Sequence, residues 1–535
     1  MLRINQIKLA PGHSKEQLKK AILKFLQIQG KDLLSFQIFK QSIDARKKPE
    51  IVFVYTIDVH VLHEEKICKR LKNKVQKIDW KPYCLPFHGE HPLAYRPVIV
   101  GAGPAGLFCT YLLAQAGYCP ILIERGAPVE ERYEDVLHFW ETNVLNPHSN
   151  VQFGEGGAGT FSDGKLNTLV KDKFGRNRYV LETFVKFGAP ERILYEQKPH
   201  IGTDILIHVV RKMREEILDL GGTVEFHTQV TDFKVQAEKE GKRITEIELN
   251  HETWITTEVV VLAIGHSARD TFECIFQKQI PMQPKSFAVG VRVEHPQAMI
   301  QESQYGKKMA DQLPAAAYKL AENLENGRGV YTFCMCPGGY VVNASSEEHR
   351  LAVNGMSYHD RAGENANSAV IVTVTPEDFE GNHALAGVEF QRKLEEAAYE
   401  AGQGKVPVQC FGDFCEHRIT TTLGEVQPQI KGMWTFGNVR TIFPEAIASS
   451  LEEGIRRMDH KIHGFARPDA ILSGVESRTS SPVKILRDEA FESDIKGIYP
   501  CGEGAGYAGG ITSAAMDGMK VAEAIIRKFQ MFTKN

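Results

Sequence analysis

The chain has 535 residues, of which 42% are hydrophobic and 24% charged, with a formal net charge of −3. This length exceeds what one hydrophobic core supports, so we expect two or three domains. No apolar run reaches the roughly 18 residues of a membrane span, and the start lacks the apolar core of a signal sequence, which indicates a cytoplasmic protein that does not bind membranes. The ten cysteines show neither a disulfide framework nor zinc-ligand spacing, so we expect reduced thiols and no metal site.

The first 88 residues are basic, with 18 Lys and Arg against 8 Asp and Glu, so they carry +10 and the remainder −13. Such asymmetry can mark a docking surface for an acidic partner or nucleic acid, but a solvated basic face is the simpler interpretation. The apolar spacing predicts the β-α-β-β-α-β order of a ferredoxin-like α+β domain, with strands over 2–9, 33–43, 50–60 and 75–79 and helices after Ser14 and over 64–74.

A proline-containing linker, residues 86–96, leads to an apolar strand over 98–100 and a G-x-G-x-x-G turn. In such a turn the first glycine permits the bend, the second lets the backbone approach a pyrophosphate, and the third lets the next helix pack closely. The helix start offers free N–H groups to phosphate. A second strand, 119–123, ends in an acid at about the ~20-residue spacing expected for a ribose ligand. An acid there disfavours a 2′-phosphate, so the pattern predicts FAD or NAD, bound by Gly101, Gly103, Pro104, Ala105, Gly106, Glu124 and Arg125.

A second glycine-dense stretch, FGEGGAGTFSDGKL, covers 153–166. Its glycines indicate close approach of the backbone to the cofactor, and we expect Gly157 to lie along the span between pyrophosphate and flavin. Lys165 fits a contact with a phosphate or the flavin, and equally a place on a surface loop.

Further along, a helix over 204–220 precedes an alternating strand over 222–233, and an apolar strand ends at Gly265. No second G-x-G-x-x-G follows a strand, so a nicotinamide reductant, if used, would dock transiently. Strand patterns then dominate 281–439, with one helix over 390–402, which predicts a β-rich domain capping the flavin.

Near the C-terminus a strand leads to Gly502-Glu503 and then to a glycine turn and a helix. A helix N-terminus there would polarise the pyrimidine end of a flavin, with contacts expected from Gly509, Gly510, Ile511 and Thr512. The predicted division of the chain is a ferredoxin-like domain (1–88), a first part of a FAD-binding domain (95–280), a substrate or capping domain (281–439) and a returning part of the FAD-binding domain (440–535).

Three residues are candidates for catalysis. Cys336, in a turn after a strand, could be a redox partner or nucleophile, although a small buried residue is the simpler interpretation. Arg478 could bind a substrate carboxylate or tie a loop to the FAD-binding domain. His417 could act as a general acid, although a surface role is favoured.

The order of these motifs resembles that of the glutathione-reductase-like flavoproteins. The segments 152–168, 262–272, 334–348, 476–488 and 502–518 are similar to the uncharacterised bacterial FAD-dependent dehydrogenase family, whose members carry a small domain before the fingerprint. The resemblance implies an α/β, glutathione-reductase-like Rossmann domain that binds FAD and is interrupted by a β-rich domain. It also implies FAD contacts at Val230, Ala263, Gly265, Gly502 and Glu503, where Glu503 replaces the Asp of many relatives.

These observations favour a FAD-dependent oxidoreductase that transfers hydride between flavin N5 and a small organic substrate, with NAD(P)H or a redox protein as a transient donor. One alternative is an RNA-associated flavoprotein that docks through its basic N-terminal domain. The N-terminal lysines are scattered around both helices, which disfavours nucleic acid. The other alternative is a flavin-binding sensor without turnover.

Overall fold

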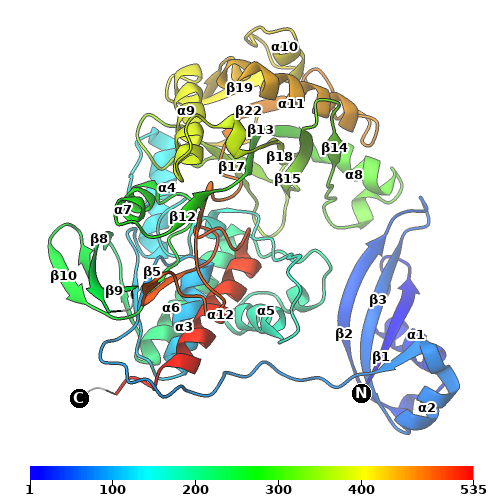
Figure 1. The fold of residues 1–535 in the computed structure, drawn as a ribbon. Coiled ribbons are helices and arrows are strands. Elements are labelled where there is room, and N and C mark those ends of the chain that lie inside the picture. The colour runs from blue at the N-terminus through cyan, green and yellow to red at the C-terminus, as the bar shows by residue number, and fades with distance from the viewer. Residues whose placement is uncertain (240, 534–535) are drawn as a thin grey trace.

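The computed structural model describes residues 1–239 and 241–533, and its N-terminal unit stands beside the rest of the molecule (Figure 1). Four antiparallel strands in the order β2-β3-β1-β4 form its sheet, and Leu18, Ile22 and Ile67 of the two helices pack on one face. This is the predicted β-α-β-β-α-β arrangement, made of β1 (Leu2–Leu9), α1 (Lys15–Leu26), β2 (Leu33–Asp44), β3 (Val52–Val61), α2 (Glu64–Leu71) and β4 (Val75–Lys77).

A five-stranded parallel sheet, in the order β25-β11-β5-β6-β7, forms the centre of the second unit. Four of its five short strands are apolar on both faces, because helices cover one side and a small antiparallel sheet covers the other; the exception is the edge strand β7. The chain runs outward from β5 in both directions, so a crevice opens at the carboxyl ends of β5 and β11. The strands are β5 (Val98–Val100), β6 (Ile121–Ile123), β7 (Thr223–Glu225), β11 (Val260–Leu262) and β25 (Ile498–Pro500).

The helices of this unit bring the two ends of its sequence together. Ten of the twelve residues of α3 are buried, because the helix is apolar all round. In Figure 1 the C-terminal α12 lies against α3, and a Cβ at Gly518 would come within 2.1 Å of the Ala105 carbonyl oxygen. The helices are α3 (Pro104–Gln115), α4 (Val129–Thr142), α5 (Arg176–Lys186), α6 (Thr203–Asp219), α7 (Arg269–Gln277) and α12 (Ile511–Lys528).

The prediction of a single strand over 222–233 is wrong, because two strands, β7 and β8, occur there. His227 has a positive φ of 51°, which breaks the extended run, so β7 joins the parallel sheet and β8 joins an antiparallel sheet. That sheet and a neighbouring two-stranded ribbon contain β8 (Val230–Glu238), β9 (Gly241–Leu249), β10 (Thr253–Thr256), β12 (Met282–Pro284), β23 (Val483–Ile485) and β24 (Ile495–Lys496).

The third unit is a seven-stranded sheet in the order β14-β15-β18-β13-β22-β19-β21, with α9 (Ala386–Ala401) and α11 (Glu445–Met458) packed on it. β22 pairs with both β13 and β19. Residues 440–479 therefore belong to this sheet, and the chain returns to the parallel sheet near 480 instead of the expected 440. The strands of the seven-stranded sheet are β13 (Phe287–Pro296), β14 (Ala321–Asn323), β15 (Gly329–Cys336), β18 (Asn365–Val374), β19 (Val406–Cys410), β21 (Trp434–Phe436) and β22 (Ile471–Glu476).

A three-stranded sheet, β17-β16-β20, and four helices complete the third unit. Across the described parts of the chain, none of the helices combines the length and apolar character needed to span a membrane, and no group of three potential metal ligands occurs. The remaining elements are α8 (Gln297–Tyr305), β16 (Tyr340–Asn343), β17 (Val353–Met356), α9 (Ala386–Ala401), α10 (Phe411–Cys415), β20 (Ile430–Lys431) and α11 (Glu445–Met458).

Candidate functional site

A cavity of about 340 Å³ lies at the carboxyl ends of β5 and β11, between the parallel sheet and the seven-stranded sheet. Segments from both glycine-rich ends of the sequence line it, together with residues of β15, β17 and β22. The predicted cofactor-binding residues that line it are Gly101, Gly103, Pro104, Ala105, Glu124, Arg125, Gly157, Lys165, Val230, Ala263, Gly265, Glu503, Gly509, Gly510 and Ile511.

The start of α3 faces this cavity without a side-chain cap, so its first N–H groups are available to a ligand. Gly103 is the N-cap residue, and a Cβ placed on it would meet only the Gly157 Cα, at 3.9 Å. The space in front of Gly103 is therefore open. Gly101 has φ 101°, and a Cβ there would lie 2.4 Å from the Ala263 carbonyl oxygen, so the turn requires glycine.

Glu124 joins three loops at the nucleotide end of the cavity. Its Oε2 accepts a hydrogen bond from Ala102 N at 2.8 Å, and its Oε1 accepts from Gly126 N and Gly154 N at 3.0 and 2.9 Å. The carboxylate is buried. A carboxylate offers about four acceptor positions, so one remains on Oε2 for a ligand hydroxyl.

Arg132 of α4 holds the loop over 150–157 in place. The side chain is fully buried and donates to the carbonyl oxygens of five loop residues. Burial lowers the pKa of this guanidinium to about 10. These hydrogen bonds fix the loop and thereby hold Gly157 opposite Gly103. The acceptors are the carbonyls of Asn150, Val151, Gly154, Glu155 and Gly157.

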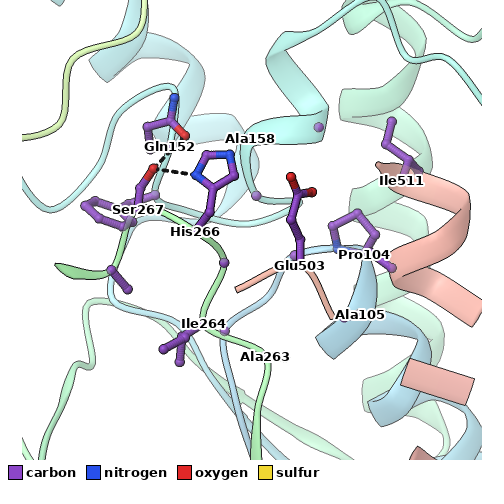
Figure 2. Close-up of a pocket in the computed structure, with 18 of the residues that line it drawn as sticks. Pro104, Ala105, Gln152, Ala158, Ala263, Ile264, His266, Ser267, Glu503 and Ile511 are labelled. Carbon is purple, nitrogen blue, oxygen red and sulfur yellow. Dashed lines mark hydrogen bonds between the residues drawn. The ribbon is translucent and has the colours of Figure 1, made fainter. Parts of the chain in front are cut away.

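Near the start of α3, α12 also begins at the cavity without a side-chain cap. Gly510, its N-cap residue, has φ 136°, and a Cβ on Gly509 or Gly510 would meet no atom within 4 Å. Glu503 points into the same space (Figure 2). Burial raises the pKa of Glu503 to about 7, although Lys285 and the backbone of Gly510 oppose this effect.

Three predicted contacts support the cavity instead of lining it. A Cβ on Gly106 would come within 1.8 Å of the Gly101 carbonyl oxygen, so this glycine serves helix packing. Gly502 N donates to Asp517 Oδ2 at 2.8 Å. Thr512 Oγ1 donates to the Leu166 carbonyl at 2.9 Å and thereby ties the start of α12 to the 162–168 loop.

A polar chain that the sequence analysis missed crosses the cavity wall (Figure 2). His266 Nδ1 lies 2.9 Å from Ser267 Oγ, which donates to Gln152 Oε1 at 3.0 Å. Burial, with Arg478 and Arg269 nearby, lowers the pKa of His266 to about 3, so the ring is neutral at pH 7. The sequence did contain a signal for His266 as a cavity residue, since it directly follows the predicted cofactor contact Gly265 after β11.

Arg478 lines the cavity, but its guanidinium is already committed to protein partners. Nε and Nη2 donate to the two carboxylate oxygens of Glu395 at 3.0 and 2.8 Å, and Nη1 donates to Ser267 and Ser346. The structure therefore favours the second interpretation, since Arg478 ties the loop after β22 to Ser267 of the FAD-binding domain and to Glu395 of α9, and most of its N–H groups are already used.

Lys165 also lines the cavity, with Nζ 2.8 Å from Asp163 Oδ2. Asp163 is buried and additionally accepts from Arg361 and Ser357. These cations hold the pKa of Asp163 well below its usual range despite its burial. Lys165 is thus a cavity residue, not a surface residue.

Of the two remaining catalytic candidates, neither lines the cavity. His417 is exposed just beyond the short helix α10, not on a strand, so it is excluded as a cavity acid. Cys336 is fully buried behind the wall, and Cys334, two residues earlier, is the cysteine that lines the cavity. In a regular strand, residues two apart share one face, but the pairing of β15 with β18 shifts register between Phe333 and Cys336, so the two side chains lie in different places.

The sequence matches a known protein family over one segment and one relative over almost its whole length. Residues 286–479 match the family described as FAD-dependent protein, C-terminal domain-like, and residues 1–60 match a domain of unknown function. A protein of Clostridium beijerinckii described only as uncharacterised is 47% identical over 536 residues, which cover 99% of each chain. The chain belongs to this family of FAD-dependent proteins.

Two solved enzyme structures align with most of this chain at low sequence identity. Glycine oxidase from Bacillus cereus aligns with 81% of this chain and 94% of its own, at 12% identity and a TM-score of 0.31. The quinol fumarate reductase FrdA of E. coli aligns with 82% and 70%, at 11% identity and a TM-score of 0.34.

FAD is the cofactor of this FAD-dependent protein, as the family match shows, and the cavity fits it. Two uncapped helix starts, those of α3 and α12, lie near each other and offer N–H groups to the cavity. Glycines at 103, 265, 509 and 510 leave open the space that side chains would fill. Both features suit a long cofactor with a charged pyrophosphate and a polar ring system. The α/β fold with an N-terminal α+β unit is likewise confirmed.

Proposed function

We propose that the protein is a dehydrogenase that transfers hydride between flavin N5 and a small organic substrate bound between the parallel and seven-stranded sheets. The observation that carries this proposal is the shape of the cavity. The uncapped starts of α3 and α12 form one wall, and Phe333, Cys334 and Asn354 of the third unit lie on another. FAD held along the first wall would leave its ring facing the second.

In this proposal the parallel-sheet unit holds the nucleotide end of FAD. The N–H groups at the start of α3 bind the pyrophosphate, and the free acceptor position of Glu124 Oε2 binds a ribose hydroxyl. Because Arg132 and Glu124 already fix the surrounding loops, binding requires little rearrangement.

The flavin end is assigned to the segment from Glu503 to Ile511. Glu503 binds the ribitol, and the N–H groups of α12 face the pyrimidine edge of the ring, where the helix dipole stabilises negative charge on the reduced flavin. When bound, FAD supplies the two-electron chemistry. The protein residues orient it and keep bulk water from its buried face.

Gly103→Ala tests the binding mode. The fold has room for the new methyl group, but the pyrophosphate needs that space, so FAD affinity should fall at least about tenfold, or ~1.4 kcal/mol, in equilibrium titration of the apoprotein. Gly329→Ala is the matched control, because its Cβ would also meet nothing closer than 3.8 Å, at the far end of β15. Equal affinities of the two variants would contradict the assignment.

Reconstitution with 5-deaza-FAD tests the reaction class, because this analogue supports hydride transfer but not one-electron chemistry. The wild-type apoprotein loaded with the analogue should still be reduced anaerobically by any metabolite or nicotinamide that reduces the FAD form. A donor that reduces only the FAD form would contradict hydride transfer. Bound flavin that no donor in a broad panel reduces would favour a sensor without turnover.

A further inference from the structure

Cys334 and Cys336 lie at a defect in the seven-stranded sheet. The pairing of β15 with β18 is regular up to Phe333 and then shifts register before Cys336. Cys334 has φ 43°, which is uncommon for any residue with a side chain. Such bulges re-aim side chains and are frequent next to active sites. Here the bulge places Cys334 on the cavity wall while Cys336 stays buried.

The two cysteines remain in contact across the bulge. Cys336 Sγ donates to the Cys334 carbonyl oxygen at 3.2 Å. Arg292 reinforces the arrangement. This fully buried guanidinium donates to the Cys334 carbonyl from Nη1 and Nη2, at 3.0 and 3.1 Å, and Nη2 lies 3.9 Å from Cys336 Sγ.

The charged groups around the pair come from several elements. Lys165 and Arg292 are the cations, and the acids are Asp163, Glu476 and Glu503. The neighbouring Cys336 thiol, Lys165 and Arg292 lower the pKa of the Cys334 thiol, whereas the neighbouring Cys334 sulfur and burial raise the pKa of Cys336. A thiolate beside a thiol is the form in which a dithiol is most readily oxidised.

The position of Cys334 relates it to the flavin end of the cavity. Cys334 lines the same cavity as Glu503, Lys165 and the start of α12. We propose that Cys334 and Cys336 form a redox-active dithiol that exchanges two electrons with the FAD of the proposed function. Cys334 faces the cavity, so it is also the sulfur that a small thiol or disulfide substrate would reach.

The exchange balances without another reactant. The Cys334 thiolate and the Cys336 thiol form one S–S bond and release two electrons and one proton. Oxidised flavin takes up both electrons and the proton, which yields its singly protonated reduced form. In the reverse direction reduced flavin breaks the S–S bond and restores the thiolate and thiol.

An anaerobic dithionite titration of the oxidised, FAD-loaded protein tests the proposal. The wild type should take up twice as many electrons per flavin as Cys334→Ser or Cys336→Ser, because only the wild type has a disulfide to reduce. Cys415→Ser is the matched control, since Cys415 lies in α10 outside the cavity, and it should behave as the wild type does.

Peptide mass spectrometry provides a readout independent of activity. After mild oxidation, Cys334 and Cys336 should resist alkylation until a reductant is added, and should be found in one disulfide-linked peptide. Equal electron uptake by wild type and Cys334→Ser, with both thiols alkylated after oxidation, would overturn the dithiol while leaving the flavin function intact. Purified wild type without flavin absorbance would instead contradict the proposed function.

Discussion

Glu294 shows how strongly burial controls single residues in this protein. The side chain is fully buried in β13, where Oε2 accepts hydrogen bonds from Asn365 Nδ2 and Gln429 N at 3.0 and 2.9 Å. Burial raises its pKa to about 7. The folded state therefore holds this proton more tightly than the unfolded chain does, so the stabilisation is present at low pH and is lost as the pH rises through the folded pKa.

Replacing Glu294 by Gln should make this pH dependence visible. The unfolding free energy of the wild type, relative to that of Glu294→Gln, should fall by up to about 1.4 kcal/mol per pH unit between about pH 4.5 and 7, and level off above. Urea unfolding at several pH values measures it. Neighbouring His295, whose pKa is lowered to about 4, titrates in both proteins and cancels.

Glu325→Gln is the control, because Glu325 is 94% exposed. Its difference from the wild type should stay nearly constant over the same range. A constant difference for Glu294→Gln as well would show that the buried carboxyl titrates normally.

The positions of the cofactor-binding motifs were predicted better than the roles of individual polar residues. At Gly101 and Gly106 a Cβ would collide with the backbone, so the turn requires glycine there and the sequence alone indicated these positions. The role of Arg478 depends on Glu395, which is distant in sequence, and the exchange of Cys336 for Cys334 depends on one bulge. Neither a long-range ion pair nor a local register shift leaves a signal in the spacing of residue types.

At the scale of elements, α3 and α12 pack so closely that a Cβ on Gly518 would lie 2.1 Å from the Ala105 carbonyl oxygen. Gly518→Ala should destabilise the protein by about 1–3 kcal/mol, because the new methyl group meets the backbone of Ala105 and not a movable side chain. This loss exceeds the ~1 kcal/mol that alanine gains in a helix. Thermal unfolding of the apoprotein measures it.

Gly387→Ala provides the matched comparison within α9. Its Cβ would approach only the side chains of Phe287, Pro482 and Phe379, at 3.1–3.2 Å, and these can shift. We expect a near-neutral change. Equal destabilisation of both variants would mean that α3 and α12 can move apart at little cost.

Most elements were predictable because they are strongly periodic or strongly apolar. The strand over 222–233 was not, since its alternation continues through His227 although the backbone turns there. The alternation of apolar and polar side chains indicates which residues are buried. It does not indicate that the chain leaves one sheet and enters another within the same stretch.

For the molecule as a whole, the N-terminal unit joins the rest through few contacts. Gln41 N donates to the Tyr195 carbonyl at 2.7 Å, and Gln197 N donates to the Gln41 carbonyl at 2.9 Å, so the edge strand β2 pairs with a loop of the parallel-sheet unit. Lys48 reaches the Ser303 carbonyl of the third unit.

Gln41→Pro should loosen this junction without unfolding either side. Proline removes the N–H that faces the loop, and an edge strand tolerates it. Hydrogen exchange of the Gln197 amide should become at least about tenfold faster, while the flavin spectrum and the exchange of β5 amides stay unchanged. Unchanged protection of Gln197 would show that other contacts hold the units together.

The division into units was predictable in outline from composition and linkers, but the return point was not. Residues 440–479 carry an amphipathic helix and an apolar strand that would suit either unit. Only the pairing of β22 with β13 and β19 shows that these residues belong to the third unit. Strands that pair over a long sequence distance cannot be recognised from the local pattern of residue types.

The packing of α12 on α3 has a consequence for how the protein is made. A ribosome releases the fingerprint early, but β25 and α12 emerge only after the whole third unit has been synthesised. Until then β11 lacks its outer neighbour and α3 exposes an apolar face, so a nascent chain cannot hold FAD in the complete site. Cofactor loading should therefore be a post-translational event, and cells short of flavin should accumulate full-length apoprotein instead of stalled fragments.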